Sequence, residues 1–257
     1  MEEIAKTRRV ITDGAKIVQL PILEALEIQE KSKIFLGFRE VVDMRISSPI
    51  GDPIWQYGIT TPDTIIYGSN HILFAMNQRT FPLVSDIKSQ LSRLPEPLQN
   101  PTNGEMRRRL YAETHFDLNE QQFRGYLMSI SELESVTVMP NSTIDAFNLE
   151  GMNANGLKEL IANRNPIVPA LFGTTQRAKD YLAKCAVIGQ GANPYIQIPD
   201  YDDLSLKDRE GKFSGSFISL GGYWEMSNAG IYPRPQGIRN PAPFADETNF
   251  VCALDSI

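Results

Sequence analysis

Two histidines are the first candidates for chemistry, because histidine is the usual acid, base and metal ligand near neutral pH. His71 lies in the apolar run NHILFAM and His115 in AETHF, which reads as a helix. Neither the HxH nor the HExxH spacing of a metal site is present. A Ser-His-Asp triad has no fixed spacing, but the GxSxG turn of many nucleophiles is missing. We therefore expect both histidines to pack or to form hydrogen bonds, with catalysis or metal binding as the alternative.

Clustered carboxylates are the second candidate. Asp200, Asp202 and Asp203 lie close together in PDYDDLSLKDRE, and such carboxylates can hold Mg²⁺ or Ca²⁺. The stretch lacks the glycine and the final glutamate of an EF-hand loop, and the charges that follow it are typical of a solvated loop. A carboxylate- or metal-dependent enzyme with its site here is one alternative for the function.

The third candidate is a basic run formed by Arg107, Arg108 and Arg109, with Tyr111 close behind it. Three consecutive residues on a helix spread over most of its circumference, so they do not form one basic face. Glutamates on both sides lie at spacings that favour a salt-bridged surface. The alternative is a nucleic-acid-binding site in which Tyr111 stacks on a base beside the cations.

The stretch CAVIGQGANP imitates the start of a dinucleotide-binding GxGxxG motif with Gly189 and Gly191. Its third glycine position is Pro194, and the run before it reads as the end of a helix, where the motif requires a strand. No GxxxxGK[ST] phosphate loop occurs in the sequence. We expect no bound nucleotide and no other cofactor.

The stretch GGYWEMSNAGIYPRPQGIRNPAPF, residues 221–244, is rich in aromatic residues, glycine and proline. It contains residue types that dominate protein interfaces, and those expected to make contacts are Tyr223, Trp224, Tyr232, Arg234 and Phe244. Its prolines keep it out of a central sheet and favour a stiff, extended chain. An apolar, strand-like ending follows it, so we predict a spanning arm that is anchored at both ends and covers a neighbouring surface.

The elements that must position these residues follow from periodicity and from turn residues. Helices are predicted from Pro21 to Ile34 as the first element, from Pro82 to Leu94, over 105–116, and over 119–130 with Asn119 as a cap. Two more are predicted over 153–165 and from a capping residue at Thr174 or Thr175 to Gly189. Three or four strands are predicted within residues 39–77, in REVVDMRIS, PIWQYGIT, DTIIYGS and HILFAMN, with Pro, Gly, Asp and Asn between them, so that a break is expected at Pro62. Other strands are predicted in ESVTVMP, YIQIP, GSFISLGGYW and NFVCALDSI.

This order predicts an α+β fold: a mixed, short-stranded sheet with several amphipathic helices and a long irregular, proline-rich C-terminal segment. We expect a mixed α+β core over residues 1–192, with an internal linker at 95–104. Residues 193–257 are expected to form an irregular β-rich segment that carries the extended arm at 221–244.

The composition, 42% hydrophobic and 22% charged among 257 residues, is that of an ordinary globular protein. A net charge of −6 gives no overall attraction for nucleic acid, so any such contact is local. Cys185 and Cys252 lie in apolar surroundings without CxxC spacing and are expected as buried thiols. The sequence shows neither a signal peptide nor an apolar run of ~20 residues, which predicts a soluble, cytoplasmic protein with no membrane contact.

Core-forming patterns are plentiful and reactive groups at useful spacings are few, which disfavours an enzyme. We predict a non-enzymatic structural or assembly subunit that associates with copies of itself or with other subunits into a shell, tube or ring. Extended arms without catalytic motifs are, by analogy of style, typical of virion and phage proteins, so incorporation in a virus particle is part of this hypothesis. The nucleic-acid-binding protein and the carboxylate-dependent enzyme stay as its alternatives.

Overall fold

The structure is a computed structural model that describes part of the chain. The described residues are 15–20, 22–32, 35–49, 52–55, 57–68, 71–76, 84–93, 115–130, 136–140, 154–188, 196–197, 212–221 and 248–253.

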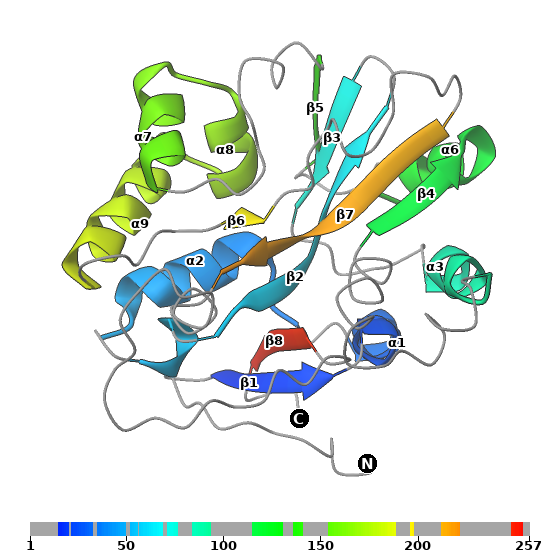
Figure 1. The fold of residues 1–257 in the computed structure, drawn as a ribbon, viewed down its shortest axis with the longest axis horizontal. Coiled ribbons are helices and arrows are strands. Elements are labelled where there is room, and N and C mark those ends of the chain that lie inside the picture. Colours follow the sequence, from blue (N-terminus) through cyan, green and yellow to red (C-terminus); the bar gives the residue numbers. More distant parts are fainter. Residues whose placement is uncertain are drawn as a thin grey trace.

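Two antiparallel sheets form the framework (Figure 1). The larger sheet has the strand order β4-β7-β2-β3-β5, and β6 pairs with the end of β7. Its strands are β2 (Ile59–Tyr67), β3 (His71–Ala75), β4 (His115–Asn119), β5 (Val136–Pro140), β6 (Ile196–Gln197) and β7 (Lys212–Leu220). The smaller sheet pairs β1 (Ala15–Leu20) with β8 (Thr248–Ala253) along all six residues. Together with the helices, these sheets confirm the predicted α+β fold.

Helices lie on both sides of the larger sheet and enclose two hydrophobic cores (Figure 1). One core includes α2 (Phe38–Ser47), the 3₁₀ turn η1 (Pro53–Trp55), α7 (Ala154–Ala162), α8 (Ile167–Phe172) and α9 (Thr175–Ile188). The other core includes α1 (Ile22–Ser32), α3 (Val84–Leu91) and α6 (Glu120–Ile130). Within the described ranges, no helix is both long enough and apolar enough to cross a bilayer.

The central strand β2 is buried along its whole length, because its side chains alternate between the two cores. Ile65 packs in the first core and Ile66 in the second. The sequence predicted a break at Pro62, yet the strand is continuous from Ile59 to Tyr67. A register shift between Thr60 and Thr64 absorbs the proline, which is how a central strand tolerates a residue without an N–H group.

The strand predicted for REVVDMRIS is wrong, because this stretch forms helix α2. Its buried side chains, Phe38, Val41, Val42 and Arg45, recur at helical spacing, which outweighs the β-branched valines. The buried carboxylate of Asp63, at the β2 irregularity, accepts the Phe38 N–H at 2.6 Å. The negative Asp63 carboxylate stabilises the positive N-terminal end of α2 and fixes the helix on the sheet.

Two further predictions were wrong. The helix expected to reach Phe116 is instead strand β4 from His115 onward, with Phe116 and Leu118 buried in strand alternation. The first described element is strand β1, which precedes the helix expected to come first. Both strands depend on partners far along the chain, β7 and β8, which local periodicity does not reveal.

Other helices and their caps agree with the sequence. The structure confirms α1, α3, α6, α7 and α9, as well as the strands β3, β5, β6, β7 and β8. Asn119 caps α6, because its Oδ1 accepts the Gln122 N–H at 2.9 Å while its own N–H donates to Gln122 Oε1. The short helix α8 was missed, although Asn165 Oδ1 accepts the Ile167 N–H at its start and Gly173, at φ +76°, ends it.

Strands from both sides of residue 192 share the two sheets: β7 lies between β2 and β4, and β8 pairs with β1. The linker predicted at 95–104 lies outside the described residues.

Candidate functional site

The predicted interface segment begins directly after β7, at a residue held by a buried arginine. Arg45 is 1% exposed and projects from α2 into a cluster of backbone carbonyls. Its Nε donates to Ile54 O at 3.1 Å and its Nη2 to Tyr57 O at 3.0 Å. Its Nη1 donates to Tyr181 Oη at 2.9 Å and to Gly221 O at 3.0 Å. One side chain thus connects α2, η1, α9 and the first residue after β7.

The charge of Arg45 has only neutral partners in the described structure. None of the described carboxylates forms an ion pair with it, so carbonyl dipoles and one phenol compensate a buried cation. The guanidinium lies 5.4 Å from the centroid of Trp55, which stacks on Tyr181 at 5.6 Å. Burial raises the pKa of Tyr181 to about 12 although the Arg45 charge lowers it, so the phenol stays neutral.

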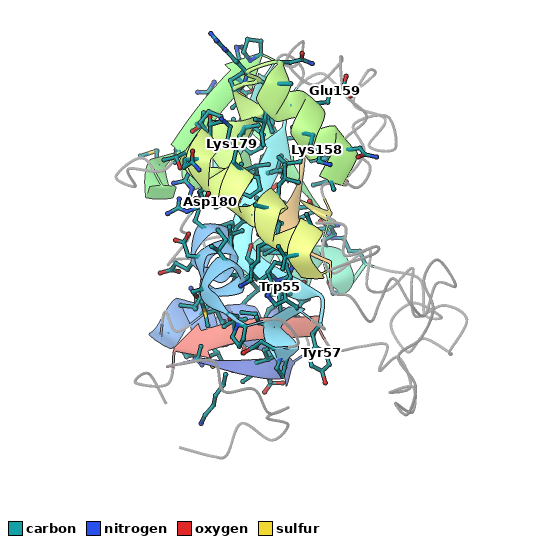
Figure 2. All side chains as sticks on the ribbon, turned by 90° about the vertical axis from the view of Figure 1, so that its left-hand side faces the viewer. Trp55, Tyr57, Lys158, Glu159, Lys179 and Asp180 are labelled. Atoms are coloured by element: carbon teal, nitrogen blue, oxygen red, sulfur yellow. The ribbon has the colours of Figure 1, made fainter. Side chains whose placement is uncertain are left out.

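Two aromatic residues, Trp55 and Tyr57, lie beside this cluster. In Figure 2, Trp55 and Tyr57 lie below the charged residues Lys179 and Asp180 of α9, on the same side of the molecule. Trp55 is 6% exposed, and its indole Nε1 has no hydrogen-bond partner among the described residues. A buried donor without an acceptor is uncommon in folded proteins.

The other end of the segment is fixed as well. β8 begins at Thr248 and pairs with β1 in continuous register, and Phe35 forms a further bridge to Cys252. Residues 222–247 therefore connect two anchored points, Gly221 and Thr248. The interface residues predicted within them, Tyr223, Trp224, Tyr232, Arg234 and Phe244, lie outside the described part of the chain.

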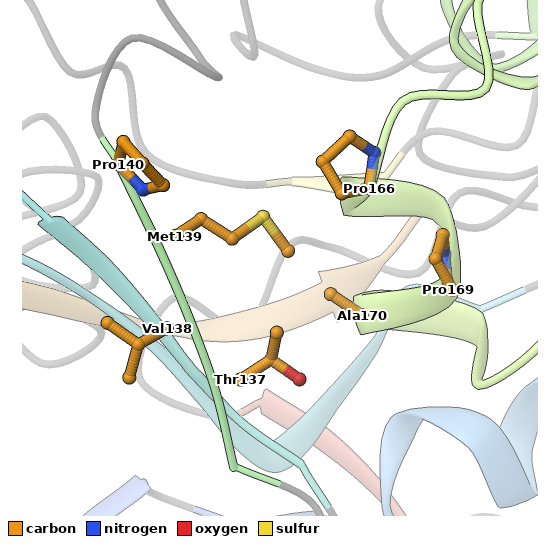
Figure 3. Close-up of a pocket in the computed structure, with 7 residues that line it drawn as sticks. All are labelled: Thr137, Val138, Met139, Pro140, Pro166, Pro169 and Ala170. Carbon is orange, nitrogen blue, oxygen red and sulfur yellow. The ribbon is translucent and has the colours of Figure 1, made fainter.

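A second feature is a groove of about 440 Å³ between the edge strand β5 and helix α8, which we call the β5–α8 groove (Figure 3). It is lined by residues 137–140 of β5 and by Pro166, Pro169 and Ala170. Figure 3 shows Thr137 and Met139 directed from β5 toward α8, with Val138 on the opposite side of the strand. The lining carries no charged side chain, so the groove suits an uncharged group.

Both cysteines are buried and free, as the sequence predicted. Burial raises the pKa of the Cys185 thiol to about 12, and it also raises the pKa of Cys252. A thiolate is the nucleophilic and metal-binding form of cysteine, so neither side chain is activated for such chemistry near neutral pH.

The two histidines lie on strands that are not neighbours. His71 begins β3 and His115 begins β4, with β2 and β7 between them. Three strand spacings put their backbones at least about 14 Å apart, which disfavours a shared metal ion. Within the described ranges, no group of three His, Cys, Asp or Glu side chains is placed to hold a metal.

The remaining predicted sites fall elsewhere in the chain. The acidic residues Asp200, Asp202 and Asp203 and the basic site Arg107, Arg108, Arg109 and Tyr111 all lie outside the described residues. The run CAVI does end helix α9 at Ile188, as predicted.

Sequence reasoning missed Arg45 and the groove. The signal for Arg45 was available, because it stands seven residues after Phe38 on an otherwise apolar helical face. The groove has no local signal, since β5 and α8 meet only in the folded chain.

Comparison with known proteins finds a solved structure with a similar fold. No protein-family model matches the chain, and no curated protein matches it. A solved structure described as "Accommodation of massive sequence variation in Nanoarchaeota by the C-type lectin fold" is similar to it, with a TM-score of 0.57 and 16% identity. The match covers 98% of this chain and 100% of the other. At this level of identity the similarity concerns the fold, and the chain shares the C-type lectin fold of that protein.

Proposed function

We propose that the chain is a non-enzymatic structural or assembly subunit, in which the arm at residues 221–244 contacts a second copy of the chain. The observation that supports this proposal is the anchoring of both ends of that segment, at Gly221 by Arg45 and at Thr248 by the pairing of β8 with β1. A long connection presented from two fixed points loses less freedom on binding than a free tail does. Its aromatic side chains are the type that carries most of the binding energy in interfaces.

The shared fold supports a binding role. The similar structure is described as one in which the C-type lectin fold accommodates massive sequence variation. A framework of that kind allows a surface connection to differ in sequence while the sheets stay intact. A recognition protein whose partner is a different molecule is therefore the second candidate function.

The described chemistry also favours a non-enzymatic role. Both thiols have raised pKa values, and the two histidines lie on strands separated by two others. The nucleic-acid site at Arg107, Arg108, Arg109 and Tyr111 and the acidic site at Asp200, Asp202 and Asp203 remain the alternatives. Salt-dependent binding of single-stranded nucleic acid would support the nucleic-acid site. Thermal stabilisation by Mg²⁺ or Ca²⁺ would support the acidic site.

Light scattering of the full chain at increasing concentration tests the proposal. We expect a dimer or a larger species, and we expect it to dissociate when Tyr223, Trp224, Tyr232 and Phe244 are all changed to Ser. The matched control changes two exposed apolar residues elsewhere, Met128→Ser and Val187→Ser, and should leave the mass unchanged. A wild-type chain that stays monomeric at every concentration contradicts the proposal.

A further inference from the structure

The outer edge of β5 is open in the described structure. Its five residues pair with β3, and no described strand pairs with its other edge. Sheet edges are usually protected by lysine, by proline, by a bulge or by a covering segment, because they otherwise accept another strand. β5 has the sequence VTVMP, which carries no charge, and Val138 is 57% exposed. Its proline is the last residue, Pro140, so the described stretch Val136–Met139 keeps an N–H group at every position and no described strand covers it.

The β5–α8 groove lies beside the same edge and defines what such a chain must carry. Its volume of about 440 Å³ is large enough for an aromatic side chain. Met139 supplies a polarisable sulfur and Pro166 and Pro169 supply flat apolar surfaces, all of which suit an aromatic ring. The lining offers no charged partner, so the groove favours an apolar side chain over a charged one. The occupant is therefore an extended, uncharged segment with an aromatic residue.

The run Asn240–Phe244, with the sequence NPAPF, has this chemistry within the proposed interface segment. It carries no charge, and Phe244 supplies the ring. Pro241 and Pro243 are two residues apart, so in an extended chain their missing N–H groups fall on the same edge. The opposite edge keeps the N–H and C=O groups of Asn240, Ala242 and Phe244, which is the set that a β-ladder requires.

We propose that Asn240–Phe244 of one copy adds as a strand to the open edge of β5 in a second copy, with Phe244 in the β5–α8 groove. This inference rests on the proposed self-association and names the surface that receives the segment. The donating and the receiving surfaces differ, so the contact is heterologous and builds a closed ring or an open tube. The two prolines face away from β5 and stop a further strand from adding.

Peptide binding to the full-length chain provides the direct test. The probe is a fluorescent peptide of residues 237–246, which should bind saturably and dissociate the self-associated species. Val138→Lys places a charge on the edge strand and Pro169→Glu places one in the groove, and each should weaken binding by roughly tenfold or more. Val187→Lys is the matched control, because Val187 is a similarly exposed valine (63%) on α9, and it should bind like the wild type.

A second variant tests the ladder itself. Ala242→Pro, in the peptide and in the full chain, removes a donor from the pairing edge and should abolish both binding and self-association. Circular dichroism should show that every variant is folded. Self-association that is unaffected by Val138→Lys, Pro169→Glu and Ala242→Pro would overturn this inference and leave the proposed function standing. A strictly monomeric wild-type chain would overturn both.

Discussion

At the scale of single residues, Arg45 shows how a buried charge joins segments that are distant in sequence. Its four hydrogen bonds reach α9, η1, Tyr57 just before β2 and Gly221 just after β7. The planar guanidinium suits this arrangement, because it presents donors in several fixed directions at once. The anchoring of the proposed interface segment therefore depends on a residue more than 170 positions earlier in the sequence.

Replacing Arg45 should destabilise the protein strongly. Arg45→Met leaves the buried Ile54 carbonyl without its donor and removes the bonds to Tyr57 and Tyr181, and we expect a loss of about 3–5 kcal/mol in the free energy of unfolding. Arg45→Lys keeps the charge and can form some of the hydrogen bonds, so its loss in the free energy of unfolding should be smaller than that of Arg45→Met. Urea unfolding measures both, and Arg124→Met, an exposed residue on α6, should change little. Equal stability of Arg45→Met and the wild type would contradict this role.

The buried thiol of Cys185 makes stability depend on alkaline pH. Burial raises its pKa from 9.0 to about 12, so the folded state keeps a proton that the unfolded state releases between these values. Its contribution to stability is present below pH 9 and is lost as the pH rises toward 12, by up to about 1.4 kcal/mol per pH unit. Urea unfolding of the wild type and of Cys185→Ala from pH 8 to pH 11 should give diverging slopes. Parallel slopes would show that this thiol does not titrate differently on folding.

At the scale of elements, β7 has no room for a side chain at Gly215, because the strand lies between β2 and β4 and the Phe116 ring covers this position. A Cβ atom at Gly215 would lie 2.5 Å from two ring atoms of Phe116 and 2.9 Å from Ile65 O. We expect Gly215→Ala to lower the free energy of unfolding by about 1–3 kcal/mol, because the packed ring must move. Urea unfolding measures the loss. A stability equal to that of the wild type would show that the sheet can accommodate a Cβ atom at Gly215.

Gly125 in α6 is the matched control for Gly215. Apart from its chain neighbours and the backbone of its own helix, no described atom lies within 4 Å of the Cβ that an alanine would add there. Gly125→Ala should therefore stabilise the protein by about 0.5–1 kcal/mol, because alanine loses less backbone freedom in a helix. The opposite signs of the two substitutions separate steric crowding from backbone entropy.

At the scale of the whole molecule, the chain closes on itself through its smaller sheet. β1 and β8 come from opposite ends of the described chain, and their side chains alternate between the two cores, as Ile17 and Val18 do. Both cores therefore depend on strands that form only after β8 has been synthesised. The same closure anchors the second end of the proposed interface segment.

The sequence by itself determined the elements whose signals are local. Apolar spacing with the caps Asn119 and Thr174 predicted α6 and α9, and β-branched runs bounded by turn residues predicted β3, β5 and β7. The anchored strand after the proline-rich segment was also predicted, and it is β8. These features follow from residues within a few positions of one another, which is why periodicity and capping rules find them.

Only the tertiary structure decided the features that depend on distant partners. β1 and β4 are strands because β8 and β7 supply their hydrogen bonds, and the Asp63 carboxylate contacts α2 across the β2 irregularity. The Arg45 cluster and the β5–α8 groove likewise join segments that lie far apart in sequence. Backbone pairing and buried hydrogen bonds over such separations leave no local pattern, so folding alone brings these residues together.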